Sequence, residues 1–350
     1  MKIIIDAKIP YIKDAIKQIT EDVVYLPGNA FTAAAVKDAD ALIVRTRTTC
    51  DAALLQNSRV KFIATATIGY DHIDQQYLQK AGITWKNAPG CNAASVAQYI
   101  GSSLLLLERD KKMVLQNLTI GIVGVGHVGK EVKKMAERLG LHILCCDPPR
   151  AAQEGPDGFV SLATIAEQCD IITFHTPLSR LGKDATYHVA DSAFFASTMH
   201  HPIIINTSRG EVIDTTALLT ALESHQVADA IIDVWEEEPS INTQLLQRVF
   251  LGTPHIAGYS ADGKANATKQ ALDALCDYFH LDYPFHIEPP APAKELLVAT
   301  SWKDAFLQMY NPLEDSNRLK ESPDKFEFFR GNYPLRREEK AYTIQYQTAL

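Results

Sequence analysis

The stretch that decides the fold is residues 121–130, which read GIVGVGHVGK. Here an apolar run, 118–123, leads into three glycines with the spacing G-x-G-x-x-G, at Gly124, Gly126 and Gly129. A helical pattern follows over 130–139. Glycines in this arrangement allow a tight turn, a close approach of the backbone to a pyrophosphate, and close packing of a helix on a strand. The stretch therefore predicts a dinucleotide-binding βαβ unit, the alternative being a glycine-rich turn with only a structural role.

The residues around this turn indicate which dinucleotide it would hold. The backbone N–H groups of His127 and Val128 begin the expected helix and would face the phosphates. Asp147 ends the next apolar run, where its carboxylate can accept hydrogen bonds from ribose hydroxyls. The same negative charge would repel the 2′-phosphate of NADP. The sequence therefore favours NAD, although Arg150 lies close by.

Short apolar runs alternate with helical segments along most of the chain, which predicts an α/β fold with parallel sheets covered on both faces. The expected strands are 3–5, 23–26, 41–44, 62–65, 118–123, 142–146, 171–174, 203–206 and 230–234. Long helices are expected over 92–110 and 261–279. Prolines in 289–292 mark a linker, and the aromatic residues beyond it argue against a disordered tail.

Composition excludes several classes of protein. The chain has 350 residues, enough for two or three domains, and 46% of them are hydrophobic. Its net charge is -8, from 34 Lys and Arg against 42 Asp and Glu, so we expect binding to neither nucleic acid nor membrane. The six cysteines fit no metal or disulfide pattern. We therefore expect no bound metal. The apolar run at 1–6 is too short for a signal peptide, so the chain is expected in the cytoplasm.

Three further segments follow predicted strands and carry candidate catalytic side chains. They read INTSRG at 205–210, DVWEEEP at 233–239 and TPHIAGY at 253–259. A histidine, His255, can take the proton of a substrate hydroxyl near neutral pH while hydride leaves the same carbon. A carboxylate such as Glu238 can orient that imidazole, and Arg209 can hold a substrate carboxylate with its two-pronged guanidinium. We choose Glu238 because it precedes Pro239, although 236–238 could form a solvated turn.

These three segments and the glycine turn resemble the signature segments of the D-isomer-specific 2-hydroxyacid dehydrogenases. The resemblance implies that Arg209 binds the substrate carboxylate, Glu238 supports the histidine, and His255 is the acid/base. It also implies two Rossmann-like doubly wound parallel-sheet domains, with the NAD domain inserted in a split substrate domain. The expected domains are 1–98 with 258–284 for substrate, 99–257 for NAD, and 285–350 as a small C-terminal α+β dimerisation module.

Further segments, among them 65–72, 88–93 and 146–150, are similar to one branch of that family. That branch oxidises a phosphorylated four-carbon 2-hydroxy acid on the bacterial route to pyridoxal phosphate, as a homodimer. By position, the resemblance implies substrate contacts from Thr46, Thr67 and Tyr259. It implies cofactor contacts from Thr176, Thr207, Ser208, Asp233 and Gly258, although Asp233 could instead be a cap at the end of a strand.

Arg45 and Arg47 are candidate ligands of a substrate phosphate, because an acidic protein must place cations locally to hold an anion. Each could equally be an ordinary surface charge. The run 330–337, with arginines at 330, 336 and 337, could supply further cations across a dimer, but we favour a solvated, charged helix start. Two other functions stay open: oxidation of another acid, such as phosphoglycerate, glycerate or lactate, and NAD sensing without catalysis, as in corepressors of this fold.

Overall fold

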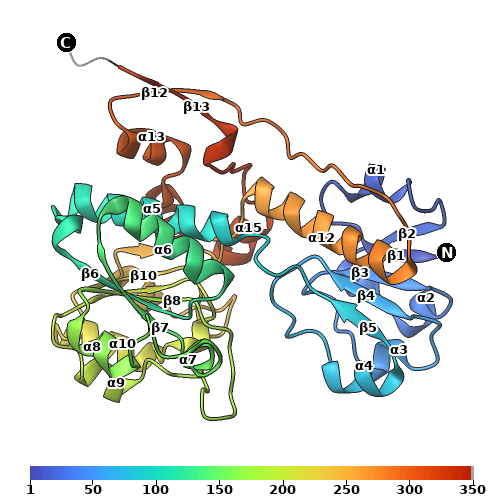
Figure 1. Ribbon diagram of the computed structural model, residues 1–350, viewed down its shortest axis with the longest axis horizontal. Coiled ribbons are helices and arrows are strands. Elements are labelled where there is room, and N and C mark those ends of the chain that lie inside the picture. The colour runs from blue at the N-terminus through green and yellow to red at the C-terminus, as the bar shows by residue number, and fades with distance from the viewer. Residues whose placement is uncertain (348–350) are drawn as a thin grey trace. The chain divides into compact units, whose positions relative to one another are not determined.

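The computed structural model describes residues 1–347, and its contacts divide the chain into two compact units (Figure 1). Unit 1 contains Met1–Asn92 and Ser260–Ala291. Unit 2 contains Ala93–Tyr259 and the described residues from Pro292 onward. Each unit has its own parallel sheet, which confirms the predicted α/β class.

Unit 1 is built on a five-stranded parallel sheet in the order β2-β1-β3-β4-β5. Its strands are β1 (Ile3–Asp6), β2 (Val23–Leu26), β3 (Ala41–Val44), β4 (Phe62–Thr65) and β5 (Thr84–Lys86). Apolar side chains of α1 (Ile12–Ile16) and α12 (Ala261–Phe279) form one core with the sheet. Those of α2 (Ala33–Val36), α3 (Ala52–Leu55) and α4 (Gln75–Ala81) form a second core with it. The strand patterns are apolar because both faces are covered.

Unit 2 is built on a six-stranded parallel sheet in the order β11-β10-β9-β8-β6-β7. The strands are β6 (Thr119–Val123), β7 (His142–Cys146), β8 (Ile171–Phe174), β9 (Ile203–Asn206), β10 (Asp229–Ile232) and β11 (Leu251–Gly252). Figure 1 shows α5 (Ala93–Asp110) and α6 (His127–Leu139) on one face of this sheet. It shows α8 (Leu162–Gln168), α9 (Ser192–Ala196) and α10 (Thr215–Glu223) on the other face. Two further helices of this part of the chain are α7 (Pro148–Glu154) and α11 (Thr243–Arg248).

The C-terminal segment belongs to unit 2 and completes its cores. It consists of β12 (Leu296–Ala299), α13 (Trp302–Met309), α14 (Pro312–Glu321), α15 (Phe326–Gly331) and β13 (Thr343–Tyr346), with β12 and β13 paired in parallel. Phe306, Leu319 and Phe326 are at most 1% exposed and pack among residues of the six-stranded sheet. The predicted α+β character of this segment is confirmed. In the described part of the chain, no helix is both long and apolar enough to cross a membrane.

The strand order decides where a ligand can bind. In unit 2 the chain runs from β6 outward to β7 and then returns to β8, on the other side of β6. Loops that leave neighbouring strands in opposite directions open a crevice at the carboxyl ends of those strands. The glycine turn of residues 124–129 follows β6 and therefore lies at this switch point. Unit 1 has an equivalent point between β1 and β3.

Candidate active site

The glycine turn is packed too tightly to admit side chains at two of its three glycines. Gly124 has φ of 88°, and a Cβ there would lie 2.8 Å from the carbonyl oxygen of His175, in the loop after β8. A Cβ on Gly129, in α6, would lie 2.1 Å from the carbonyl oxygen of Gly124. Only glycine fits both positions, so the close packing of helix α6 on strand β6 that the motif predicts is present.

The same turn leaves room and polar atoms for a phosphate-bearing cofactor. A Cβ on Gly126 would meet no atom within 4 Å, so this glycine is not required by packing within the protein. His127 and Val128 begin α6, where backbone N–H groups have no partner inside the helix. The Thr176 Oγ1 atom is buried and has no hydrogen-bond partner among the described residues. A buried hydroxyl of this kind is costly unless a ligand or water satisfies it. These features fit the pyrophosphate of NAD.

Asp147 lies at the end of β7 and connects the glycine turn to α7. Its Oδ2 accepts a hydrogen bond from the Val125 N–H at 2.8 Å, and its Oδ1 accepts one from the Arg150 N–H at 3.1 Å. The Arg150 guanidinium pairs with Glu154 at 2.6 Å and donates to the Val125 carbonyl at 2.6 Å. Because Arg150 is held by these partners, its presence does not weaken the expectation of NAD that rests on Asp147.

His175 follows β8 and supports the expected cofactor contact Thr207. Burial lowers the pKa of His175 to about 3, so its imidazole is neutral. The ring bonds the Thr173 hydroxyl at 2.9 Å through Nε2 and the Thr207 hydroxyl at 3.3 Å through Nδ1. In the next residue, both the N–H and the hydroxyl of Ser208 donate to Asn206 Oδ1. His175 thus orients the Thr207 hydroxyl from a buried position.

Glu238 and His255 form the central pair of the candidate site. Glu238 Oε2 lies 2.8 Å from His255 Nδ1, while Oε1 accepts a hydrogen bond from the Trp235 N–H at 3.0 Å. Burial alone would raise the pKa of Glu238, but the hydrogen bond and charge of His255, with help from Trp235 and Arg330, hold it below its usual value. The carboxylate is therefore ionised at neutral pH. With Nδ1 directed at it, the imidazole presents Nε2 for chemistry.

The backbone around His255 is held in an unusual conformation by Asp233. His255 has φ of 57°, in the left-handed region, which costs a residue with a side chain about 1 kcal/mol. The buried Asp233 carboxylate accepts hydrogen bonds from the Thr253 hydroxyl and from the N–H groups of Ile256 and Ala257. Burial raises the pKa of Asp233, and these donors and His255 oppose that rise. Asp233 thus clamps residues 253–257 and fixes the direction of the imidazole.

Arg209 is brought to the same edge of the sheet. It follows β9, Glu238 follows β10 and His255 follows β11, and these three strands are neighbours. The Arg209 Nη1 donates to the Ser208 carbonyl at 2.7 Å. A Cβ on Gly210 would lie 2.0 Å from the carbonyl carbon of Trp235, so the loops after β9 and β10 are in direct contact. Neighbouring parallel strands thus gather the predicted catalytic residues within unit 2.

Tyr259 lies beside Arg330, an arginine that was expected in a solvated segment. Gly258 and Tyr259 end the loop that begins at His255, and the Tyr259 hydroxyl accepts a hydrogen bond from Arg330 Nε at 3.2 Å. The Arg330 side chain is 23% exposed, and Arg336 and Arg337 are buried. The expectation of a solvated helix start at 330–337 is therefore wrong. Charge alone suggested solvent, but contacts with unit 2 bury these side chains.

The other predicted substrate residues lie in unit 1, at the carboxyl ends of its strands. Arg45, after β3, pairs with the fully buried Asp6 at the end of β1 through Nε at 3.1 Å and Nη2 at 3.3 Å. Thr46 and Arg47 follow Arg45 directly. The position of β3 next to β1 places this segment at the switch point of the unit 1 sheet.

Thr67, after β4, belongs to a short chain of hydroxyl groups. The Thr67 Oγ1 atom lies 2.7 Å from Thr65 Oγ1 and donates to the Gly69 carbonyl at 2.9 Å. Thr65 Oγ1 in turn lies 3.0 Å from His72 Nε2. Burial lowers the pKa of His72, so its imidazole is neutral near pH 7. His72 thus orients Thr67 through Thr65, a link that spacing along the chain did not reveal.

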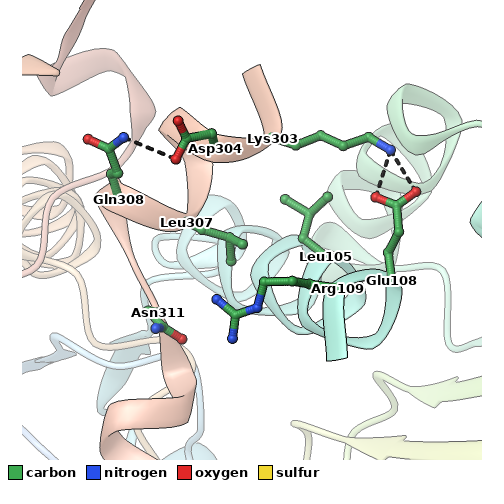
Figure 2. Close-up of a pocket in the computed structure, with 8 residues that line it drawn as sticks. All are labelled: Leu105, Glu108, Arg109, Lys303, Asp304, Leu307, Gln308 and Asn311. Atoms are coloured by element: carbon green, nitrogen blue, oxygen red, sulfur yellow. Dashed lines mark hydrogen bonds and ion pairs between the residues drawn. The ribbon is translucent and has the colours of Figure 1, made fainter. Parts of the chain in front are cut away.

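A cavity of about 510 Å³ lies between α5 and α13 in unit 2 (Figure 2). Most charged side chains that line the cavity have partners within it. Lys303 pairs with Glu108 at 2.7 Å, and Asp304 accepts a hydrogen bond from Gln308. None of the predicted site residues lines this cavity. Among the residues that the structure describes, there is also no cluster of His, Cys, Asp or Glu able to hold a metal ion.

Comparison with curated proteins finds close relatives of the whole chain. It is 59% identical to an erythronate-4-phosphate dehydrogenase of Bacteroides thetaiotaomicron, over 98% of this chain and 99% of that relative. It is 42% identical to one of Porphyromonas gingivalis, over 98% and 95%, and 40% identical to one of Escherichia coli, over 97% and 92%.

Solved structures and a family model agree with the fold. A 3-phosphoglycerate dehydrogenase of Entamoeba histolytica with NAD⁺ bound has a TM-score of 0.67 and 28% identity, covering 80% of this chain and 95% of that one. A D-lactate dehydrogenase of Aquifex aeolicus, at 23% identity and a TM-score of 0.67, covers 80% and 96% and shows the shared fold. Residues 106–257 match the family model described as "D-isomer specific 2-hydroxyacid dehydrogenase, NAD binding domain". The chain therefore belongs to the erythronate-4-phosphate dehydrogenases, a branch of the D-isomer-specific 2-hydroxyacid dehydrogenases.

Proposed function

We propose that this protein oxidises 4-phospho-D-erythronate to (R)-3-hydroxy-2-oxo-4-phosphobutanoate with NAD, on the route to pyridoxine 5′-phosphate. Relatives of that name match nearly the full chain, which supports this substrate over other 2-hydroxy acids. The observation that carries the chemistry is the Glu238–His255 pair at 2.8 Å, in the same unit as the glycine turn.

The chain's own residues divide the work of oxidation. His255 Nε2 takes the proton of the substrate 2-hydroxyl, and the imidazolium that forms is stabilised by Glu238 at Nδ1. NAD, when bound, supplies the acceptor for the hydride that leaves carbon 2. Arg209 holds the substrate carboxylate and polarises the oxygen as it becomes a carbonyl. In the reverse direction, protonated His255 returns the proton.

The cofactor and substrate contacts follow the same assignment. Gly124, Gly126, Gly129, His127 and Val128 hold the pyrophosphate, and Asp147 holds the ribose. The rest of the NAD site is lined by Thr176, Thr207, Ser208, Asp233 and Gly258. Of these, Asp233 acts through the loop of residues 253–257, which it holds by hydrogen bonds. Thr46, Thr67 and Tyr259 contact the substrate, and Arg45 and Arg47 contact its phosphate. Arg45 is already paired with Asp6, which fixes its guanidinium but offsets part of its charge.

The test is a comparison of kcat/KM across acids. We expect a preference of at least a hundredfold for 4-phospho-D-erythronate over 3-phosphoglycerate, glycerate and lactate, because pockets that pair with polar groups reject analogues lacking them. Preference for an unphosphorylated acid would contradict the proposal. His255→Asn should abolish turnover while NADH still binds, and NADH binding without any turnover in the wild-type protein would favour the sensing alternative.

Two further expectations concern assembly and location. We propose that residues 1–98 with 258–284 bind substrate, that 99–257 bind NAD, and that 285–350 join two copies into a homodimer. Sedimentation of the purified chain tests the dimer, and a monomer at micromolar concentration would contradict it. All six cysteines are buried, which suits a reducing compartment, and we propose the cytoplasm.

A further inference from the structure

Arg330 reaches the catalytic pair from far along the chain. It lies on α15 in the C-terminal segment, and its Nη1 is 3.4 Å from Glu238 Oε2. That oxygen is the one facing His255 Nδ1 at 2.8 Å. The Nε of the same guanidinium donates to the Tyr259 hydroxyl at 3.2 Å. One side chain therefore contacts the carboxylate that orients the acid/base and the tyrosine at the end of the same loop.

Arg330 remains charged in this setting. Burial opposes its charge, but Tyr259 and Glu238 more than offset that effect and raise the pKa of the guanidinium above its usual value. The other titratable groups around the cluster include Glu327, on the same helix, Asp233, beside His255, and Tyr333, whose ring packs on Tyr259. Glu238 thus lies between a permanent cation and a histidine whose charge changes during the reaction.

Two further contacts tie the C-terminal segment to the loop of residues 255–259. Arg336 Nη2 donates to the Ala257 carbonyl at 2.5 Å, and Arg336 is itself only 5% exposed. The rings of Tyr333 and Tyr259 pack edge to face with centroids 6.1 Å apart. The segment therefore holds this loop at its middle and at its end, and Arg330 adds the contact to the catalytic carboxylate.

We propose that Arg330 is a positioning residue for the oxidation, which holds Glu238 and Tyr259 in place and sets the pH range in which His255 accepts the substrate proton. This inference rests on the proposed function. A cation close to the imidazole disfavours a second positive charge there. It also fixes the Tyr259 hydroxyl as an acceptor toward Arg330, which directs the proton of that hydroxyl elsewhere. The C-terminal segment is thus part of the catalytic machinery of its own chain.

The experiment compares Arg330→Met and Arg330→Lys with wild type in the full-length protein. For Arg330→Met we expect kcat to fall about tenfold, because an orienting contact of the acid/base is lost. We also expect the pH at half-maximal oxidation to rise by roughly 0.5–1 unit, as expected when a screened cation is removed at short range. Arg330→Lys keeps the charge and should restore the pH midpoint, with kcat only partly recovered. Lys325→Met, which removes an exposed cation just before α15, should match wild type in both quantities.

Three outcomes would overturn the inference. One is wild-type kcat and pH midpoint in Arg330→Met. Another is an equal loss of kcat in Arg330→Met and Arg330→Lys, with an unchanged pH at half-maximal oxidation and a lower melting temperature, as expected of a purely structural side chain. If Arg330→Met does not fold, a shifted midpoint in Arg330→Lys contradicts the charge argument. Absence of turnover in the wild-type protein would instead count against the proposed function itself.

Discussion

Oxygen Oε2 of Glu238 is the atom on which the candidate site converges, since it faces both His255 and Arg330. The pKa of this carboxyl lies below its usual value, so the stabilising contribution of the ion pair is present at neutral pH. That contribution is lost as the pH falls through the lowered pKa. Acid in that range should therefore weaken the ion pair of the site.

Glu238→Gln tests the charge of this residue with little change in shape. An amide cannot stabilise the imidazolium, so the pH at half-maximal oxidation should fall, opposite to the shift expected for Arg330→Met. The rate of reduction at pH 7 should drop by at least tenfold, because reduction needs the protonated imidazole. Rate profiles in both directions measure this. Glu237→Gln, at an exposed neighbour, is the control, and an upward shift in Glu238→Gln would contradict the assignment.

At the scale of elements, two glycines in the turn between β6 and α6 have different roles: Gly126 leaves room for the ligand, and Gly129 allows the helix to pack on the strand. Gly126→Ala places a methyl group where no protein atom lies within 4 Å. We expect the melting temperature to change by only a few degrees, since the loss is at most about 1 kcal/mol at a helix N-cap. The Kd for NADH should rise at least tenfold, because the methyl group occupies the phosphate position.

Gly129→Ala is the matched comparison in the same turn. Its Cβ would lie 2.1 Å from the Gly124 carbonyl oxygen, so helix and strand must move apart. We expect a clear fall in melting temperature together with weaker NADH binding. Thermal melts and fluorescence titrations distinguish the two variants. Equal effects of both on stability would contradict this division of roles.

The alternation of apolar runs and helical patterns along the chain was enough to predict the position of most strands. The nine expected strands are present, and each is buried on both faces or lies beside such a strand. Four strands were missed: β12 and β13, with four residues each, and the shorter β5 and β11, with three and two. Runs this short carry too few residues for a periodic pattern, and pairing with a neighbouring strand, not local sequence, makes them strands.

Across the whole molecule, the C-terminal segment is part of the core of unit 2. Phe326→Ala removes a ring that is 1% exposed, and we expect a loss of about 3–5 kcal/mol in the free energy of unfolding. Phe328→Ala, on the same helix but 62% exposed, should cost less than about 0.5 kcal/mol. Denaturant unfolding of both variants measures the difference. Equal stability would show that the segment folds independently of the sheet.

The sequence by itself determined the parallel α/β architecture, the glycine turn with Asp147, and the three segments that carry Arg209, Glu238 and His255. These features depend on patterns within about ten residues, where periodicity and turn chemistry act. Only the tertiary structure decided that Arg330 meets Glu238 across 92 positions of chain, and that His175 and His72 orient threonines. Such contacts arise when separate elements pack together, and the burial that packing produces is what turns an apparent surface arginine into part of the site.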